Sequence, residues 1–245
     1  MSIFDGLYGY ECVMLICGFV LFVFTLAAIV VMLVQRRSMK ALVTLLLISI
    51  VMMGFPGIQS IKFSHDLVEI DRARAQPLTG MSAGQKQKYV EALANVQQRS
   101  GDEPLLQAKV ADGYRAIGEV DKAYGLAQSV LAKQPSAAAS KLLVPVLTAK
   151  LEQSTPALHM TGTTPISVAS QQEIAKVASQ LQAQSVRLPA DSHVALANAY
   201  VALGQPQRAR ANVEAARRIN PQTRINPAVQ NAIRHPPAAS TSGVH

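Results

Sequence analysis

A long uncharged stretch near the N-terminus limits what this chain can fold into more than any other feature. Cys12 to Val34 holds 23 residues without Asp, Glu, Lys or Arg. At 1.5 Å of rise per residue, such a helix exceeds the roughly 20 residues needed to cross a bilayer. No basic segment precedes it, and the residues before Cys17 lack the small side chains of a signal-peptidase site. We therefore expect an uncleaved transmembrane helix over about 12–34.

A second uncharged stretch follows closely. It runs from Ala41 to Ile61, and Gly54, Pro56 and Gly57 interrupt its later part. We expect a second membrane helix over about 41–61 that is kinked or ends early, because Pro removes a helical hydrogen bond. The connection between the two stretches is short, which predicts a transmembrane hairpin over residues 1–61.

Three basic residues in that connection predict the orientation. Arg36, Arg37 and Lys40 lie between the apolar stretches, whereas the segment before Cys12 has no Lys or Arg. Basic loops stay on the cytoplasmic side. The expected topology is a two-pass protein of a bacterial inner membrane, with both termini and the remaining chain in the periplasm.

Small side chains form one stripe on the first membrane helix. Gly18, Thr25 and Ala28 would let another helix approach closely. The partner is either the second helix of the same hairpin or a membrane helix of another protein.

Composition favours an all-α protein and narrows its partners. Trp is absent, aromatic residues make up 5% of the chain, and both cysteines, Cys12 and Cys17, lie in the first apolar stretch. The soluble part therefore has no disulfide or thiolate site. The net charge of +8 does not indicate nucleic acid, because the basic residues are scattered among acidic ones without stacking aromatics.

Two segments of the soluble part match each other at identical offsets. The matching pairs, each 86 residues apart, are Val110 and Leu196, Ala111 and Ala197, Tyr114 and Tyr200, Gly118 and Gly204, Ala123 and Ala209, and Pro135 and Pro221. The alanines suit close helix approach, the tyrosines fill the space between paired helices, the glycines end a first helix in left-handed geometry, and the prolines stop a second helix.

This pattern resembles the tetratricopeptide repeat, a 34-residue helix-turn-helix unit. The resemblance implies a helical repeat domain, or α-solenoid, over 62–223. Its clear repeats are 104–137 and 190–223, and a degenerate repeat with an insertion occupies 138–189. Within the degenerate repeat we expect helices at about 136–153 and 167–187, with Pro145 inside the first.

Two further segments flank the repeats. A helix over about 83–99, with Ser82 as its cap, is expected before the first clear repeat. Residues 224–245 are expected to hold one short helix, about 227–233, followed by a disordered tail.

Tetratricopeptide domains bind peptides or folded proteins on the concave face of their first helices, and the resemblance implies the same here. Members that clamp a terminal carboxylate use paired Lys, Arg and Asn on that face, a pattern that only Asn198 matches. By repeat position the partner-binding residues would be Ala108, Asp112, Arg115, Val194, Asn198 and Val201.

The sequence offers no chemistry for catalysis. Its histidines are dispersed, and none pairs with Cys or Glu at a metal-ligand spacing. No phosphate-binding glycine loop or nucleophile motif is present. We expect no catalytic residue, no cofactor site and no metal site, and we interpret the protein as a non-enzyme.

Two functions fit these expectations. The first is a non-catalytic interaction subunit or assembly factor of a bacterial inner-membrane complex, which recruits another protein subunit through periplasmic repeats. The second is a chaperone-like receptor that transiently binds unfolded or C-terminal peptides, as in cytochrome c maturation. The chain is similar to the tetratricopeptide factor of that pathway in architecture only, because that factor has a long cytoplasmic loop where this chain has six residues.

Overall fold

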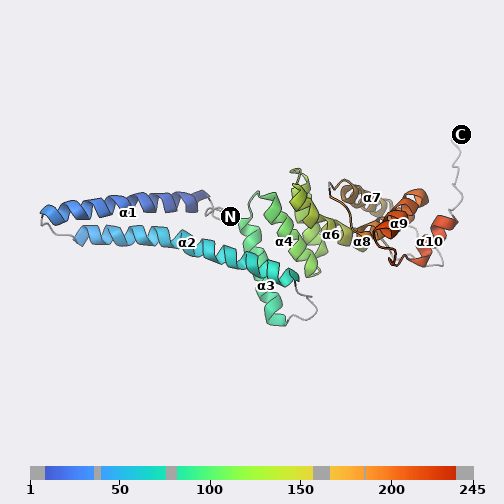
Figure 1. The fold of residues 1–245 in the computed structure, drawn as a ribbon, viewed down its shortest axis with the longest axis horizontal. Coiled ribbons are helices and arrows are strands. Elements are labelled where there is room, and N and C mark those ends of the chain that lie inside the picture. The colour runs from blue at the N-terminus through green and yellow to red at the C-terminus, as the bar shows by residue number, and fades with distance from the viewer. Residues whose placement is uncertain (1–8, 36–39, 76–81, 157–165, 185, 236–245) are drawn as a thin grey trace. The chain divides into compact units, whose positions relative to one another are not determined.

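The described part of the chain is entirely helical. The structure is a computed structural model that describes residues 9–35, 40–75, 82–156, 166–184 and 186–235 (Figure 1). No strand occurs within these ranges, so the predicted all-α class is confirmed for them. The chain forms two compact units, Met1–Gly101 and Asp102–His245.

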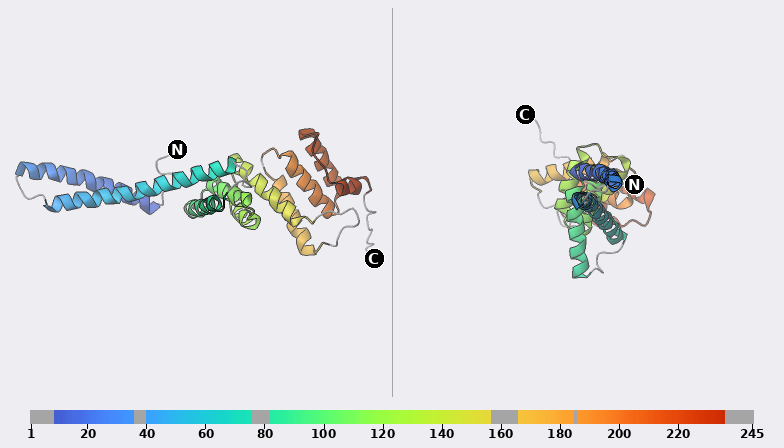
Figure 2. Two further views of the ribbon diagram at one scale, coloured as in Figure 1. Left: turned by 90° about the horizontal axis from the view of Figure 1, so that it is seen from below. Right: turned by 90° about the vertical axis from the view of Figure 1, so that its left-hand side faces the viewer.

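The first unit begins with two long helices, α1 (Gly9–Gln35) and α2 (Lys40–Ala75). They lie side by side and antiparallel in both side views (Figures 1 and 2). Within α1, Val13–Val31 is long and apolar enough to cross a membrane, with a mean hydropathy of 2.9. The apolar part of α2, Val43–Met52, is shorter than a membrane span. By length and composition, one described helix is therefore suited to cross a bilayer.

Helix α2 corrects the prediction that the second apolar helix ends near residue 61. It continues through Pro56 to Ala75, so the expected end at residue 61 falls inside it. The tertiary structure supplies the reason, since Phe63 and Ile70 are buried beyond the proline and α2 packs on α3. This packing offsets the hydrogen bond that Pro56 cannot make.

The helix expected over 83–99 is present as α3 (Ala83–Arg99). The Ser82 hydroxyl accepts a hydrogen bond from the Gln85 backbone N–H, and the Gln85 side chain accepts one from the Ser82 N–H, at 3.3 and 2.9 Å. This reciprocal cap satisfies two donors that a helix start leaves free. Tyr89, Leu93 and Val96 form the buried face of α3.

The second unit is a series of helical pairs whose bounds follow the expected repeats closely. The segments expected as repeats, 104–137, 138–189 and 190–223, each contain two helices to within one residue at the bounds, and a short helix follows. They are α4 (Pro104–Ala116), α5 (Val120–Leu131), α6 (Ala137–Ser154), α7 (Val168–Gln182), α8 (Ala190–Ala202), α9 (Pro206–Ile219) and α10 (Pro227–Arg234). Helix α7 ends earlier than the expected residue 187, and the expected tail lies outside the described residues from 236 onward.

The two clear pairs share their turn geometry. Gly118 and Gly204 have φ values of +88° and +68°, a conformation that glycine adopts without steric cost. The N–H of the residue after each glycine reaches back to the tyrosine carbonyl, from Glu119 to Tyr114 at 3.0 Å and from Gln205 to Tyr200 at 2.7 Å. Both first helices thus end in the same glycine cap.

The predicted packing positions lie in the core of the second unit. Tyr114 and Tyr200 are buried, as are the small residues of both pairs, Ala111, Ala197, Ala123 and Ala209. The first helices of successive pairs also contact one another, α4 with α6 and α6 with α8. They form a continuous layer along the unit.

Candidate partner-binding groove

A groove runs over the layer of first helices in the second unit. Its cavity volume is about 530 Å³, and its lining comes from α4, α6, the segment before α8, and the start of α8. Half of the lining belongs to α6, where Val144, Pro145, Thr148 and Ala149 share one face. That face follows the helical spacing of three and four residues.

A buried hydrogen bond closes the floor of this groove. The hydroxyl oxygens of Thr148 and Ser192 lie 2.8 Å apart, and both side chains are buried. The Thr148 hydroxyl also lies 2.8 Å from the carbonyl of Val144, one turn earlier in α6. These contacts join α6 to α8 and satisfy the polar groups that the packing buries.

Pro145 opens the backbone of α6 where the groove passes over it. Helix α6 stays continuous through Pro145, but the proline has no N–H to donate to the carbonyl of Lys141. Both residues line the groove. The Lys141 carbonyl therefore lacks the donor that an ordinary residue at 145 would supply.

Opposite charges line the groove. Arg115, Lys141 and Arg187 are basic, and Glu152 and Asp191 are acidic. Partial burial and the nearby Asp191 carboxylate raise the pKa of Glu152 above its ordinary value of 4.5. Like charges disfavour ionisation of each other, so a cation near Glu152 and Asp191 would relieve the repulsion.

The structure separates the six sequence-predicted partner-binding residues. On α4, Ala108 and Asp112 are buried, so their side chains do not reach a partner in this conformation. Arg115 is half-buried, pairs with Asp112 at 2.8 Å and lines the groove. Only Arg115 among the six belongs to the groove.

The three predicted residues on α8 lie elsewhere. Val194 and Val201 pack against a core cluster that includes Ile225 and Val229, so the chain after α9 covers this part of α8. Asn198 is half-buried, and its Oδ1 atom has no hydrogen-bond partner in the described structure. The expectation of an open face at these positions did not allow for the contribution of α10.

Sequence reasoning missed most of the groove because its lining comes from the degenerate repeat. Thr148 and Glu152 lie on α6. The set of matching residues 86 positions apart includes no residue of α6. One signal was available in the sequence, since Pro145 falls inside a segment that otherwise reads as a helix. A proline retained within a helix marks a place where a backbone carbonyl has lost its helical donor.

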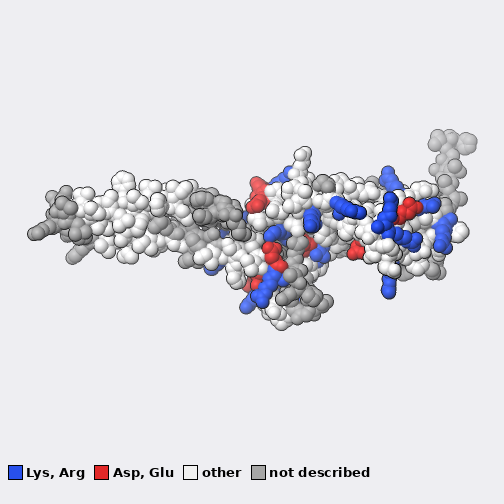
Figure 3. Space-filling model, viewed as in Figure 1, with Lys and Arg blue, Asp and Glu red and all other residues white. Residues whose placement is uncertain are grey.

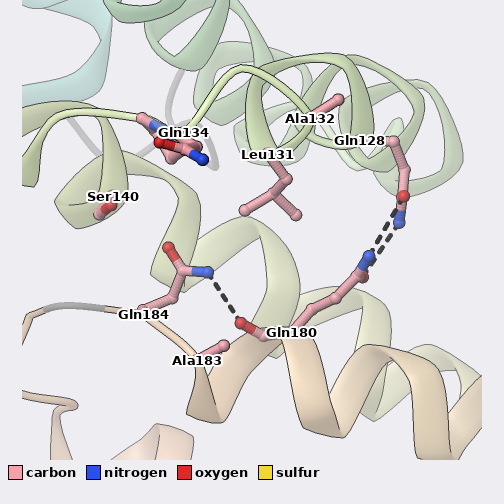
Figure 4. Close-up of a pocket in the computed structure, with 9 residues that line it drawn as sticks. Gln128, Leu131, Ala132, Gln134, Ser140, Gln180, Ala183 and Gln184 are labelled. Atoms are coloured by element: carbon pink, nitrogen blue, oxygen red, sulfur yellow. Dashed lines mark hydrogen bonds between the residues drawn. The ribbon is translucent and has the colours of Figure 1, made fainter.

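A second cavity, between α5 and α7, is lined by amide side chains (Figure 4). Gln128 and Gln180 exchange hydrogen bonds at 3.0 and 3.2 Å, and the Tyr124 hydroxyl donates to Gln180 at 3.0 Å. Gln184 donates to the Gln180 carbonyl at 2.7 Å, while its own Oε1 atom is buried without a partner in the described structure. Most of these amide groups are engaged with one another, which suits helix packing more than ligand capture.

Lys150 fixes three helices together beside this cavity. Its ammonium group lies 2.8 Å from Asp121 on α5 and 2.8 Å from Glu173 on α7. Burial lowers the pKa of Lys150, but hydrogen bonds and charge attraction from the two carboxylates outweigh burial and raise it. Lys150 in turn lowers the pKa of Asp121 and Glu173.

The predicted features of the first unit are only partly described. Gly18 and Thr25 are buried and Ala28 is half-buried on α1. Since α2 lies alongside, it is the helix that covers this stripe. Arg36 and Arg37 lie outside the described residues, and Lys40 begins α2.

Within the described ranges, no group of three or more His, Cys, Asp or Glu side chains could hold a metal ion. No family model matches the chain, and neither the curated proteins nor the solved structures contain a match.

Proposed function

We propose that this protein is a non-catalytic interaction subunit or assembly factor of a bacterial inner-membrane complex, and that it recruits a partner protein through the groove over α4, α6 and α8. The groove itself carries the proposal. It lies on the first helices of three successive pairs and combines an apolar α6 face with charges of both signs. These groups suit an extended peptide segment, whose side chains alternate in direction.

The pairwise match of α4–α5 with α8–α9 supports a tetratricopeptide-like repeat domain for this role. Both pairs repeat the same buried tyrosine, the same small residues and the same glycine cap. Repeats of this kind present extended binding surfaces along their length. The groove extends along that direction.

We further propose that α1 and α2 form a two-pass membrane hairpin, with the repeat domain in the periplasm. The apolar span of α1 and the basic loop residues Arg36, Arg37 and Lys40 support this topology. An alkaline phosphatase fusion at about residue 100 should be active, and a cytoplasmic reporter at the same site should not be. If the chain is instead recovered in the soluble periplasmic fraction without its first helix, that helix is a cleaved signal sequence and not a membrane anchor.

The groove is tested by blocking it in the full-length protein. Ala149 lines the groove and Ala169 is exposed on α7 outside it, so Ala149→Arg and Ala169→Arg are matched variants of the same type. After purification in mild detergent, Ala149→Arg should lose the co-eluting partner chains and Ala169→Arg should retain them. Retention by both variants, with unchanged helicity by circular dichroism, would refute the groove as the recruiting surface.

One observation favours the chaperone-like alternative. The small and apolar side chains of Val144, Pro145 and Ala149 in the groove can contact an extended peptide of many sequences. A receptor for unfolded chains would then bind many peptides with modest affinity and exchange them. A stable subunit would instead elute with fixed stoichiometry through repeated purification, and size-exclusion chromatography at decreasing concentration separates the two cases.

A further inference from the structure

The net positive charge of this protein is not spread evenly, contrary to the scattered distribution expected above, but is concentrated in its last helices. Residues 177–245 contain seven Arg and no Lys, against only Asp191 and Glu214, which gives +5 of the total formal charge of +8. Residues 62–176 instead carry nine Lys and four Arg against eleven acidic residues. Figure 3 shows basic side chains, in blue, gathered over α9 and α10, with few acidic ones among them; the sequence identifies them as arginines.

The structure places these arginines on the outer face of the last pair. Arg210, Arg217 and Arg218 are exposed on α9, and Arg224 and Arg234 are exposed after it; these five residues are called the arginine surface below. The opposite face of α9 is already buried through Ala209, Asn212, Val213 and Ala216. The arginine surface is therefore separate from the groove described above.

Few of these arginines are neutralised within the described chain. Arg210 pairs with Glu214 at 3.2 Å. Arg218 donates only to the Glu214 backbone carbonyl, at 3.4 Å. Within the described residues, Arg217, Arg224 and Arg234 have no carboxylate partner. Several guanidinium groups thus keep their planar pairs of donors open to solvent.

We propose that the arginine surface docks an acidic segment of a partner protein, whose carboxylates pair with Arg217, Arg218 and Arg224. Guanidinium groups bind carboxylates in bidentate geometry, which Lys cannot reproduce. The absence of Lys from this region fits a surface selected for that geometry. Arg is also enriched in protein interfaces, where Lys is depleted.

The same region offers other anionic partners little recognition beyond charge. Its only aromatic residue is Tyr200, which is buried, so no ring is available to stack on nucleic-acid bases. A helix that binds at a membrane surface inserts an apolar face between the lipids, but the apolar face of α9 is buried in the unit. Arginine also attracts the phosphates of duplex DNA and of anionic lipids through charge alone, so both serve as competing probes in the experiment. A carboxylate segment is the occupant that these features favour.

The test uses the full-length protein in nanodiscs of neutral phosphatidylcholine. The probe is a helical peptide of Glu and Ala, with its Gln counterpart as the blank. The variant R217Q/R218Q/R224Q should bind the acidic peptide about tenfold more weakly, as expected for the loss of three exposed ion pairs. The variant R217K/R218K/R224K should recover only part of this affinity, because charge remains and bidentate geometry does not.

The matched control removes the same charge elsewhere. Lys86, Lys88 and Lys176 are exposed and lie outside the arginine surface, and K86Q/K88Q/K176Q should bind the acidic peptide within twofold of the unmodified protein. Circular dichroism verifies that each variant keeps its helicity.

Three outcomes would overturn the proposal. In the first, the lysine control loses as much affinity as the arginine variant, which would mean that net charge alone drives binding. In the second, the Arg-to-Lys variant binds as tightly as the unmodified protein. In the third, phosphatidylglycerol vesicles or duplex DNA bind more tightly than the peptide and lose that binding in R217Q/R218Q/R224Q.

Discussion

The pairs α4–α5 and α8–α9 have the same frame but different surfaces. Besides the shared tyrosine and glycine cap, a cation lies over each tyrosine ring at the same offset, Lys122 at 4.0 Å from the Tyr114 centroid and Arg208 at 5.6 Å from the Tyr200 centroid. Such contacts are worth about 0.5–1 kcal/mol at exposed sites. The correspondence between residues 86 positions apart therefore includes Lys122 and Arg208. A cation lies at this position in both pairs although the residue type differs.

Other equivalent positions have diverged in chemistry. Asp112 and Arg115 form an ion pair on α4, whereas the corresponding residues on α8 are Asn198 and Val201. Val201 instead joins the core cluster that includes Val229. Packing between paired helices thus constrains the tyrosine, alanine and glycine positions, while the positions between them adapt to whichever element lies next to each pair.

The strongest test of the shared frame is removal of the aromatic ring from each copy. Tyr114→Ala and Tyr200→Ala should each lower the free energy of unfolding by about 3–5 kcal/mol, the usual cost of truncating a buried aromatic residue. Chemical unfolding of the full-length protein in detergent, followed by circular dichroism, measures both. A large loss in one copy and none in the other would show that the two tyrosines do not have equivalent roles.

Enlarging the small residue of each second helix should have a smaller effect. Ala123 and Ala209 are fully buried, so Ala123→Leu and Ala209→Leu should each cost about 1–3 kcal/mol through overpacking. The same unfolding measurement applies, with the exposed Ala211→Leu on α9 as the control. If either buried site accepts Leu without loss of stability, close helix approach is not required there.

Substitution of glycine by alanine should have opposite effects on stability at the two capping glycines and at a glycine inside a helix. Gly118→Ala and Gly204→Ala should each destabilise by about 1–2 kcal/mol, because φ is positive at both and alanine is strained in that geometry. No atom lies within 4 Å of the added Cβ at either site, so backbone strain is the sole cost.

Gly125 provides the control for these substitutions. It lies inside α5, a Cβ there also meets nothing within 4 Å, and the equivalent residue of the second pair is Ala211. Gly125→Ala should therefore stabilise by about 0.5–1 kcal/mol. Equal effects at Gly118, Gly204 and Gly125 would contradict the cap assignment.

The smallest predicted effect concerns two carboxylates near the middle pair, α6 and α7. The pKa of Glu152 is raised by burial and by Asp191, so its ionisation opposes folding as the pH rises above about 4.3, the unfolded value. Glu152→Gln should stabilise by a few tenths of a kcal/mol at pH 7 and not at pH 3.5. Thermal unfolding at both pH values measures the difference.

Glu173 should behave in the opposite way. Lys150 lowers its pKa, so its contribution to stability is present at neutral pH and is lost as the pH falls through the lowered pKa. Glu173→Gln should therefore destabilise the protein at pH 7. The effect should be small, because the side chain is 46% exposed and solvent screens its ion pair. The same sign of effect for both Gln variants would refute these assignments.

Local signals in the sequence predicted most of the helices of the second unit. The 86-residue match located both clear pairs, because glycine caps and close alanine contacts act within a few residues of their own position. Helices α3 and α10 were likewise expected near their observed bounds, since the Ser82 cap and Pro227 are local start signals. The apolar stretch of α1 required no tertiary information, because length and hydropathy alone define it.

Other features depended on contacts between distant segments. The continuation of α2 beyond Pro56 coincides with burial of Phe63 and Ile70, which depends on packing against α3, a helix that follows later in the chain. The covering of Val194 and Val201 rests on a cluster with Ile225 and Val229. The groove required α4, α6 and α8 to meet in one layer, with Thr148 hydrogen-bonded to Ser192 across 44 positions of the chain.

The sequence by itself therefore determined the helical class, the apolar N-terminal helix and the paired helices of the clear repeats, because turns, caps and hydrophobic spacing are short-range properties of the chain. Only the tertiary structure decided which of the polar residues face solvent together. Burial depends on the neighbouring element as much as on the residue, so Asp112 is buried and Arg115 lines a groove although they lie three residues apart on one helix.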